Sequence, residues 1–126
     1  MKNSKKLMRM ATMHAFLQTS NMEELAKATA KEFNAAHSGD VEVDSVKENG
    51  FTMRRKKDAV ITDSDVQNSI RDALIDIIDE NVDDIKDFIS ENYEFEYDPS
   101  IITAGFISDV FDIDRSGRLI YIEVDV

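Results

Sequence analysis

The stretch DSDVQNSIRDALIDIIDENVDDIKDFISENY, residues 63–93, decides the fold class of this chain. Its apolar residues recur at steps of three and four, which places them on one face of a helix. An unbroken helix would be about 45 Å long, well over twice the average length, so we expect a break near Glu80–Asn81. We predict two consecutive helices that share one buried face, with Asp63 or Ser64 as the N-cap. The apolar residues are Val66, Ile70, Ala73, Leu74, Ile77, Ile78, Val82, Ile85, Phe88 and Ile89.

The negative charge of the chain is concentrated on these helices. The net charge is −11, and residues 58–98 carry 14 acids against 2 bases, whereas residues 1–57 carry 11 bases against 7 acids. A strongly acidic face repels duplex DNA and anionic membranes and attracts a basic protein. We therefore predict a contact with a basic or nucleic-acid-binding protein, with no direct contact to nucleic acid or membrane. The acids expected to make it are Asp65, Asp72, Asp76, Asp79, Glu80, Asp83 and Asp87.

Length and composition exclude several classes of protein. A chain of 126 residues with 42% apolar residues is long enough for one self-supporting core. The absence of cysteine excludes disulfides and thiolate catalysis. No apolar run approaches the roughly 18 residues of a membrane span, and no secretory signal is apparent. We expect a single domain over residues 1–126 in the cytoplasm, or in the host cytoplasm if the protein is virus-encoded.

The N-terminal segment, residues 2–19, contains four bases and no acid. Met10, Met13 and Leu17 stand at helical spacing and would face the core. Such a basic helix either packs on the core or is a separately mobile element that binds a partner or a membrane surface. We predict a helix here and leave these two roles open.

A second helix is expected from a capping signature at residues 20–24 to about His37. Ser38-Gly39 supplies its C-terminal stop. The residues expected to face inward are Met22, Leu25, Ala26, Ala30 and Phe33.

Residues 41–61 predict a β-hairpin. The alternation over residues 41–46 indicates a strand, and Asn49-Gly50 is typical of a type I′ turn. The second strand is expected to run from Phe51 towards Ile61 through four consecutive bases, Arg54 to Lys57. These bases suggest either a patch for nucleic acid or an acidic partner, or an edge strand protected by charge near the acidic helices.

The C-terminal third predicts strands. Residues 94–97 alternate, and residues 101–113 are rich in β-branched and aromatic side chains, which favours a strand with an irregularity at Gly105. A helix capped by Asp98, with Pro99 at its first position, is the alternative. A turn at residues 114–117 precedes a final strand. That strand would bury Ile120, Ile122, Val124 and Val126.

The order of elements gives the fold class. Two N-terminal helices, a hairpin, an acidic helix pair and a C-terminal hairpin indicate α+β, because helices and strands occur in runs and do not alternate strictly. We predict a mainly antiparallel sheet with helices on one face.

Residues 112–123, DIDRSGRLIYIE, form the most specific motif. They resemble the twelve-residue calcium-binding loop of the EF-hand family, with oxygen-bearing residues at the first, third and fifth loop positions and glutamate at the last. The resemblance implies a Ca²⁺ site formed by Asp112, Asp114, Ser116 and Glu123. The ninth loop position departs from the family because it is Ile120. A tight hairpin turn explains the same Asp, Ser and Gly without a metal.

The sequence offers little for catalysis. His14 and His37 are the two imidazoles, and neither belongs to a triad-like or ligand-spaced pattern. There is no glycine-rich phosphate loop and no H-E-x-x-H motif. We expect a protein that is not an enzyme and needs no cofactor.

Three functions fit these observations. The first is an acidic protein-binding module, in its concrete form a virus-encoded inhibitor that mimics nucleic acid. Acids four residues apart on a helix are about 6 Å apart along its axis, whereas duplex DNA presents a charge every ~1.7 Å. Neighbouring acids or a second subunit would therefore have to complete the mimicry. The others are a structural subunit that forms oligomers and a calcium-binding protein. A solvated face that keeps the protein soluble is the alternative to any acidic contact.

Overall fold

The structure, a computed structural model, describes residues 2–19, 21–37, 39–56, 60–93, 97, 100 and 102–124. Within these residues the chain forms helices and strands in the order α1 (Lys2–Thr19), α2 (Met22–His37), β1 (Val41–Lys47), β2 (Gly50–Arg55), α3 (Asp63–Glu80), α4 (Val82–Asn92), α5 (Ala104–Val110), β3 (Phe111–Ser116) and β4 (Leu119–Val124).

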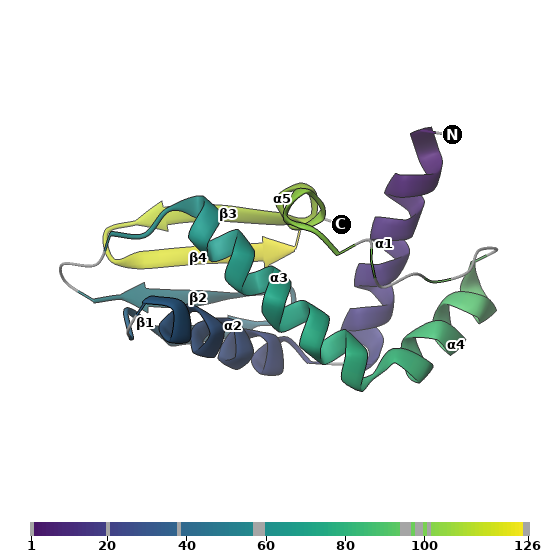
Figure 1. Cartoon of the computed structure of the whole chain (residues 1–126), viewed down its shortest axis with the longest axis horizontal. Helices are drawn as coiled ribbons and strands as arrows, with labels where there is room; N and C mark the ends of the chain where they lie inside the picture. Colours follow the sequence, from purple (N-terminus) through teal and green to yellow (C-terminus); the bar gives the residue numbers. More distant parts are fainter. Residues whose placement is uncertain are drawn as a thin grey trace.

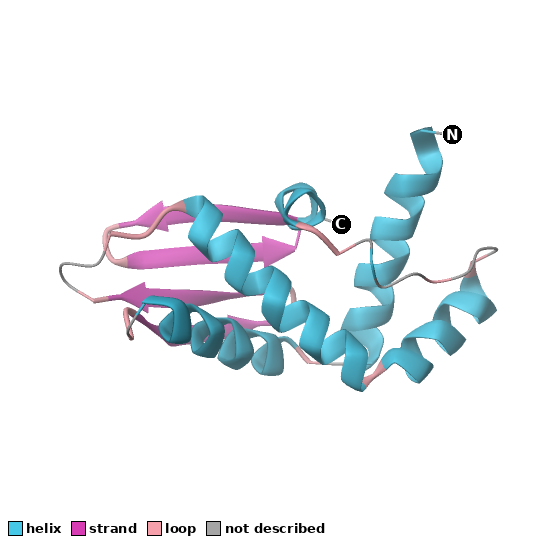
Figure 2. Cartoon of the chain, viewed as in Figure 1, coloured by secondary structure: helices cyan, strands magenta, loops and turns pink. Residues whose placement is uncertain are grey.

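The four strands form one antiparallel sheet in the order β1-β2-β4-β3. Helices α2 and α3 lie side by side over one face of this sheet, and α1 and α4 stand together beyond one end of it (Figures 1 and 2). The side chains of β4 alternate between more and less buried positions, as expected when one face of the sheet is covered, whereas residues 50–53 of β2 are all buried. The predicted α+β fold, with an antiparallel sheet and helices on one face, is confirmed.

The predicted break between the two acidic helices is confirmed. Asn81 separates α3 from α4, and its backbone N–H donates to the carbonyls of Ile77 (3.2 Å) and Ile78 (3.1 Å). Its side-chain amide donates to the Ile77 carbonyl as well, at 2.9 Å. The two helices then take different partners. Helix α3 packs on α2 and α5, whereas α4 packs on α1 and buries Ile85 and Ile89 there.

The N-cap of α3 is Thr62, so the expected cap at Asp63 or Ser64 is wrong. The Thr62 hydroxyl accepts a hydrogen bond from the Asp65 backbone N–H at 3.2 Å. The Asp65 carboxylate accepts one from the Thr62 backbone N–H, also at 3.2 Å. This reciprocal capping box satisfies two of the backbone donors left free at a helix start.

The helix expected over residues 2–19 is confirmed, but its buried face is rotated. Met13 is buried, whereas Met10 is 43% exposed and Leu17 is only partly buried. Ala11, Ala15 and Phe16 are fully buried, so they and Met13 form the buried face of the helix. For α2, all five residues expected to face inward are buried.

The first hairpin forms, but its turn lies one residue earlier than predicted. Glu48 and Asn49 make the turn, and Gly50 begins β2 opposite Lys47. Gly50 does not have the positive φ of a type I′ turn residue. It is required for another reason: a Cβ at this position would collide with the carbonyl oxygen of Ile122 on β4.

The edge-strand interpretation of the four bases is wrong. Strand β2 lies between β1 and β4, and it ends at Arg55, well before Ile61. Arg54 pairs with Asp44 of β1 at 2.8 Å on the exposed face of the sheet, so at this position the base balances a neighbouring acid. Lys57 lies outside the described residues.

The strand expected over residues 101–113 is wrong up to residue 110, where the chain forms helix α5. The alternative of a helix in this region holds for residues 104–110, where the Thr103 hydroxyl accepts from the Phe106 backbone N–H at 3.2 Å and caps the helix. The cap expected at Asp98 and Pro99 lies outside the described residues. Strand β3 follows at once and makes a two-residue hairpin with β4 through Gly117 (φ +61°) and Arg118. Residues 94–96 of the strand predicted over residues 94–97 lie outside the described residues. So does Val126, which was expected to face inward.

Candidate partner-binding surface

The predicted partner-binding acids separate into two groups. Those in the first half of α3 are already engaged within the protein. Asp65 belongs to the capping box and lies 3.9 Å from His37 of α2. Asp72 pairs with the neighbouring Arg71 at 3.1 Å. These two acids stabilise or orient α3, and their carboxylates are less available to a partner.

Asp65 is the acid with the clearest electrostatic signature. Hydrogen bonding by the Thr62 side chain, followed by the Thr62 backbone N–H, holds the pKa of Asp65 below its ordinary value. Smaller contributions come from the positive charges of His37 and Arg115. The lowered pKa therefore reflects helix capping rather than a catalytic environment.

The second group extends from the last turns of α3 along the length of α4 (Figure 1). All its members are exposed. None lies within 4.0 Å of a basic nitrogen among the residues that the structure describes. We call this group the acidic corner; it comprises Asp76, Asp79, Glu80, Asp83, Asp84, Asp87 and Glu91.

Helix α4 gathers its acids on one side. At 100° per residue, Asp83, Asp84, Asp87 and Glu91 fall within an arc of about 100°. Ile85 and Ile89 lie on the opposite side and are buried. The four carboxylates are spread over about 12 Å of helix axis, or one charge per ~4 Å. Asp84 and Glu91 are among the neighbouring acids expected to complete the mimicry, and the angular spacing places them on the same side as Asp83 and Asp87.

Part of the acidic corner is expected to cost stability. The last turn of α3 contains Asp79 and Glu80 and no base, although negative charge is unfavourable at a helix C-terminus. Along α4, Asp87 follows Asp83 by four residues and Glu91 follows Asp87 by four, and like charges at this spacing repel. Asp83 and Asp84 lie in the first turn of α4, where negative charge is favourable, so the unfavourable charges are those at the end of α3 and the repelling pairs along α4.

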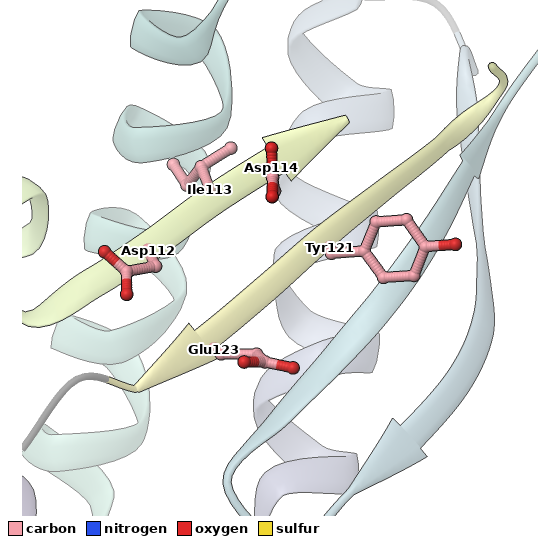
Figure 3. Close-up of a pocket in the computed structure, with 5 residues that line it drawn as sticks. All are labelled: Asp112, Ile113, Asp114, Tyr121 and Glu123. Atoms are coloured by element: carbon pink, nitrogen blue, oxygen red, sulfur yellow. The ribbon is translucent and has the colours of Figure 1, made fainter. Parts of the chain in front are cut away.

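Residues 112–123 form a β-hairpin and not a twelve-residue loop. Asp112 is the register partner of Glu123, Asp114 that of Tyr121 and Ser116 that of Leu119. The side chains of Asp112 and Asp114 project from β3 and that of Glu123 projects from β4, so the three acids are spread along the hairpin (Figure 3). Among the described residues, no group of three or more Asp, Glu, His or Cys side chains is arranged to hold a metal ion. The stretch thus lacks the geometry on which the calcium prediction depended.

The two histidines have packing roles. His14 meets Phe88 edge to face, with 5.0 Å between ring centroids, and its Nδ1 lies 3.3 Å from the Tyr93 hydroxyl. His37 stacks on Phe33 at 4.4 Å. The first contact joins α1 to α4, and the second lies within α2.

Comparisons with protein-family models, with curated proteins and with solved structures found no significant match. Within the described part of the chain, no helix is both long and apolar enough to cross a membrane.

Proposed function

We propose that this chain is a non-enzymatic protein-binding module whose acidic corner contacts the basic surface of a nucleic-acid-binding protein. The observation that carries the proposal is the accumulation of seven exposed carboxylates at one bend, none of them in an ion pair with a described base. Exposed acids elsewhere on α3 do have such partners, for example Asp63 with Arg115 at 2.8 Å. Carboxylates left without counter-charges at a cost in stability are free to bind an external base.

Charge spacing favours mimicry of a single strand over mimicry of a duplex. The α4 acids present one charge per ~4 Å of helix axis, whereas a nucleic-acid strand presents one per 3.4 Å and a duplex one per ~1.7 Å. The average spacing is close to that of one phosphate backbone, although the successive intervals along the axis are about 1.5, 4.5 and 6 Å. In this form the protein is an inhibitor that occupies a groove for single-stranded nucleic acid.

The test is capture of partners on the immobilised protein from extract of its own cells, with elution by increasing salt. We expect a nucleic-acid-binding protein that moderate salt releases, because ion pairs between exposed groups are screened. Reversing charge at Asp76, Asp79, Asp83 and Asp87 should abolish capture while circular dichroism stays unchanged. If the same protein is captured after that reversal, the acidic corner is not the contact.

A matched control separates a local effect from an effect of net charge. The variant Asp79→Lys/Asp83→Lys and the control Glu42→Lys/Glu48→Lys change the net charge equally, and Glu42 and Glu48 are exposed residues of the first hairpin. We expect the first variant to lose the partner and the control to retain it. Equal loss in both would mean that total charge, and not the acidic corner, governs binding.

A further inference from the structure

Strand β3 is an edge of the sheet, and within the described residues its outer side pairs with no other strand. It pairs with β4 in regular register along its whole length, Phe111–Ser116. The other edge strand, β1, is interrupted by a register shift between Val43 and Ser45. Bulges of this kind are a common protection against unwanted pairing. Strand β3 has no such bulge, so its outer backbone groups form a regular template, except that the Arg115 N–H already donates to the Asp114 carboxylate at 3.2 Å.

A shallow hollow of about 460 Å³ lies beside this edge on the face of the sheet away from α2 and α3. Asp112 and Asp114 of β3 and Glu123 of β4 project around it, and Tyr121 stands between them and β2 (Figure 3). The three acids are exposed and Tyr121 is half-buried. The hollow therefore combines negative charge with an aromatic ring, which suits a basic side chain.

The two β3 acids are spaced for an extended segment. Asp112 and Asp114 lie two residues apart on one strand, or about 7 Å, and point to the same face. A strand added antiparallel to β3 would present every second side chain to that face, directly opposite these acids. The hollow over β4 lies two strand spacings, about 10 Å, from such a strand. Only a long side chain such as Lys or Arg can reach it.

A second copy of β3 is a poor occupant of this edge. An antiparallel pair centred on Ile113 would place Asp112 of one copy opposite Asp114 of the other, and like charges directly opposite are destabilising. Lys47 lies 3.8 Å from Glu123 and offsets part of the charge there. Asp112 has no ion pair with a described base. The charge complementarity of the edge is thus with a basic segment of another chain.

We propose that β3 accepts an extended peptide segment with Lys or Arg at every second position, which adds to the sheet as a fifth strand. The backbone of the edge supplies the affinity, as in other cases of strand addition, and Asp112 and Asp114 select the alternating bases. The Tyr121 ring and Glu123 receive the end of one long basic side chain. This site is separate from the acidic corner and does not depend on it.

The test uses a labelled eight-residue peptide with Lys at alternate positions and Thr between them, with binding followed by fluorescence anisotropy at low salt. We expect saturable binding, and amide chemical-shift changes in NMR spectra that are largest along β3. A peptide of the same composition with its lysines consecutive should bind at least tenfold more weakly. Equal affinity for the two peptides would overturn the selection of alternating bases.

Two further comparisons separate strand addition from general attraction to acid. The double variant Asp112→Asn/Asp114→Asn should weaken binding at least tenfold, while Asp76→Asn/Asp79→Asn, which removes the same charge from the acidic corner, should leave it unchanged. N-methylation of alternate peptide amides on the side that faces β3 should abolish binding without a change in charge. Equal losses in the two protein variants, or full binding of the N-methylated peptide, would overturn the proposal.

Discussion

Gly50 of β2 and Glu123 of β4 are register partners, and a Cβ added to Gly50 would stand only 3.0 Å from the Cα of Glu123. Pairing between β2 and β4 joins the N-terminal hairpin to the C-terminal one, which is far away in sequence. The two hairpins can therefore form a single four-stranded sheet only if the backbones of β2 and β4 approach closely at Gly50.

We predict that Gly50→Ala destabilises the fold by about 1–3 kcal/mol, because the added methyl group meets backbone that has little room to move. The measurement is urea unfolding followed by circular dichroism. If Gly50→Ala is as stable as the parent chain, β2 and β4 do not approach each other this closely at Gly50.

Gly117 provides a contrasting case. Its φ is +61°, but nothing lies within 4 Å of an added Cβ. We predict that Gly117→Ala costs about 1–2 kcal/mol through backbone strain alone, and that Gly117→Asn costs less because Asn tolerates the left-handed conformation. Thermal unfolding of the two variants measures this order. Equal stability of the Ala variant and the parent would show that this turn does not need a positive φ.

The capping box of α3 predicts a pH-dependent stability. Because the pKa of Asp65 is lowered on folding from its ordinary value of 3.8, its carboxylate stabilises the fold above that pH. The contribution is lost as the pH falls through the lowered folded value. Asp65→Asn should therefore be less stable than the parent at pH 7, and the difference should shrink below about pH 3.8.

Urea unfolding at several pH values measures this difference, with Glu48→Gln in the exposed turn as the control. A gap between Asp65→Asn and the parent that stays constant down to pH 2 would contradict the assigned role of the carboxylate. Thr62→Ala, which removes the hydroxyl acceptor, should cost about 1 kcal/mol at neutral pH.

The acidic corner predicts a gain in stability when its charge is removed. Asp79→Asn/Glu80→Gln removes two negative charges from the C-terminal end of α3, where the helix dipole disfavours them. We expect the melting temperature to rise by about 1–3 °C at low salt and this gain to diminish in high salt. The control Glu42→Gln/Glu48→Gln should change the melting temperature less. A fall in melting temperature would mean that the acids are needed for folding.

The sequence could predict the parts of the fold in which one local signal dominates. Helical periodicity and excessive length together predicted the break at Asn81, and alternation predicted the burial of Ile120 and Ile122 in β4. The helix α5 could not be predicted in the same way, because residues such as Ile107 favour strands by propensity. Its formation depends on the Thr103 cap and on burial of Phe106 and Ile107 against the core.

The candidate sites show a similar division. Charge counting located the acidic region, but it could not show that Asp65 and Asp72 are engaged locally whereas Asp79 and Asp83 are not. That difference depends on the distances to His37 and to other bases in three dimensions. The edge position of β3 was equally beyond prediction, because it follows from the pairing of β2 with β4.

The most direct test of the central claim is displacement of labelled single-stranded nucleic acid from the captured partner. We predict that the parent protein and the control Glu42→Lys/Glu48→Lys displace it at similar concentrations, whereas Asp79→Lys/Asp83→Lys needs at least tenfold more. If Asp79→Lys/Asp83→Lys displaces the nucleic acid as well as the parent does, the acidic corner does not imitate a nucleic-acid strand.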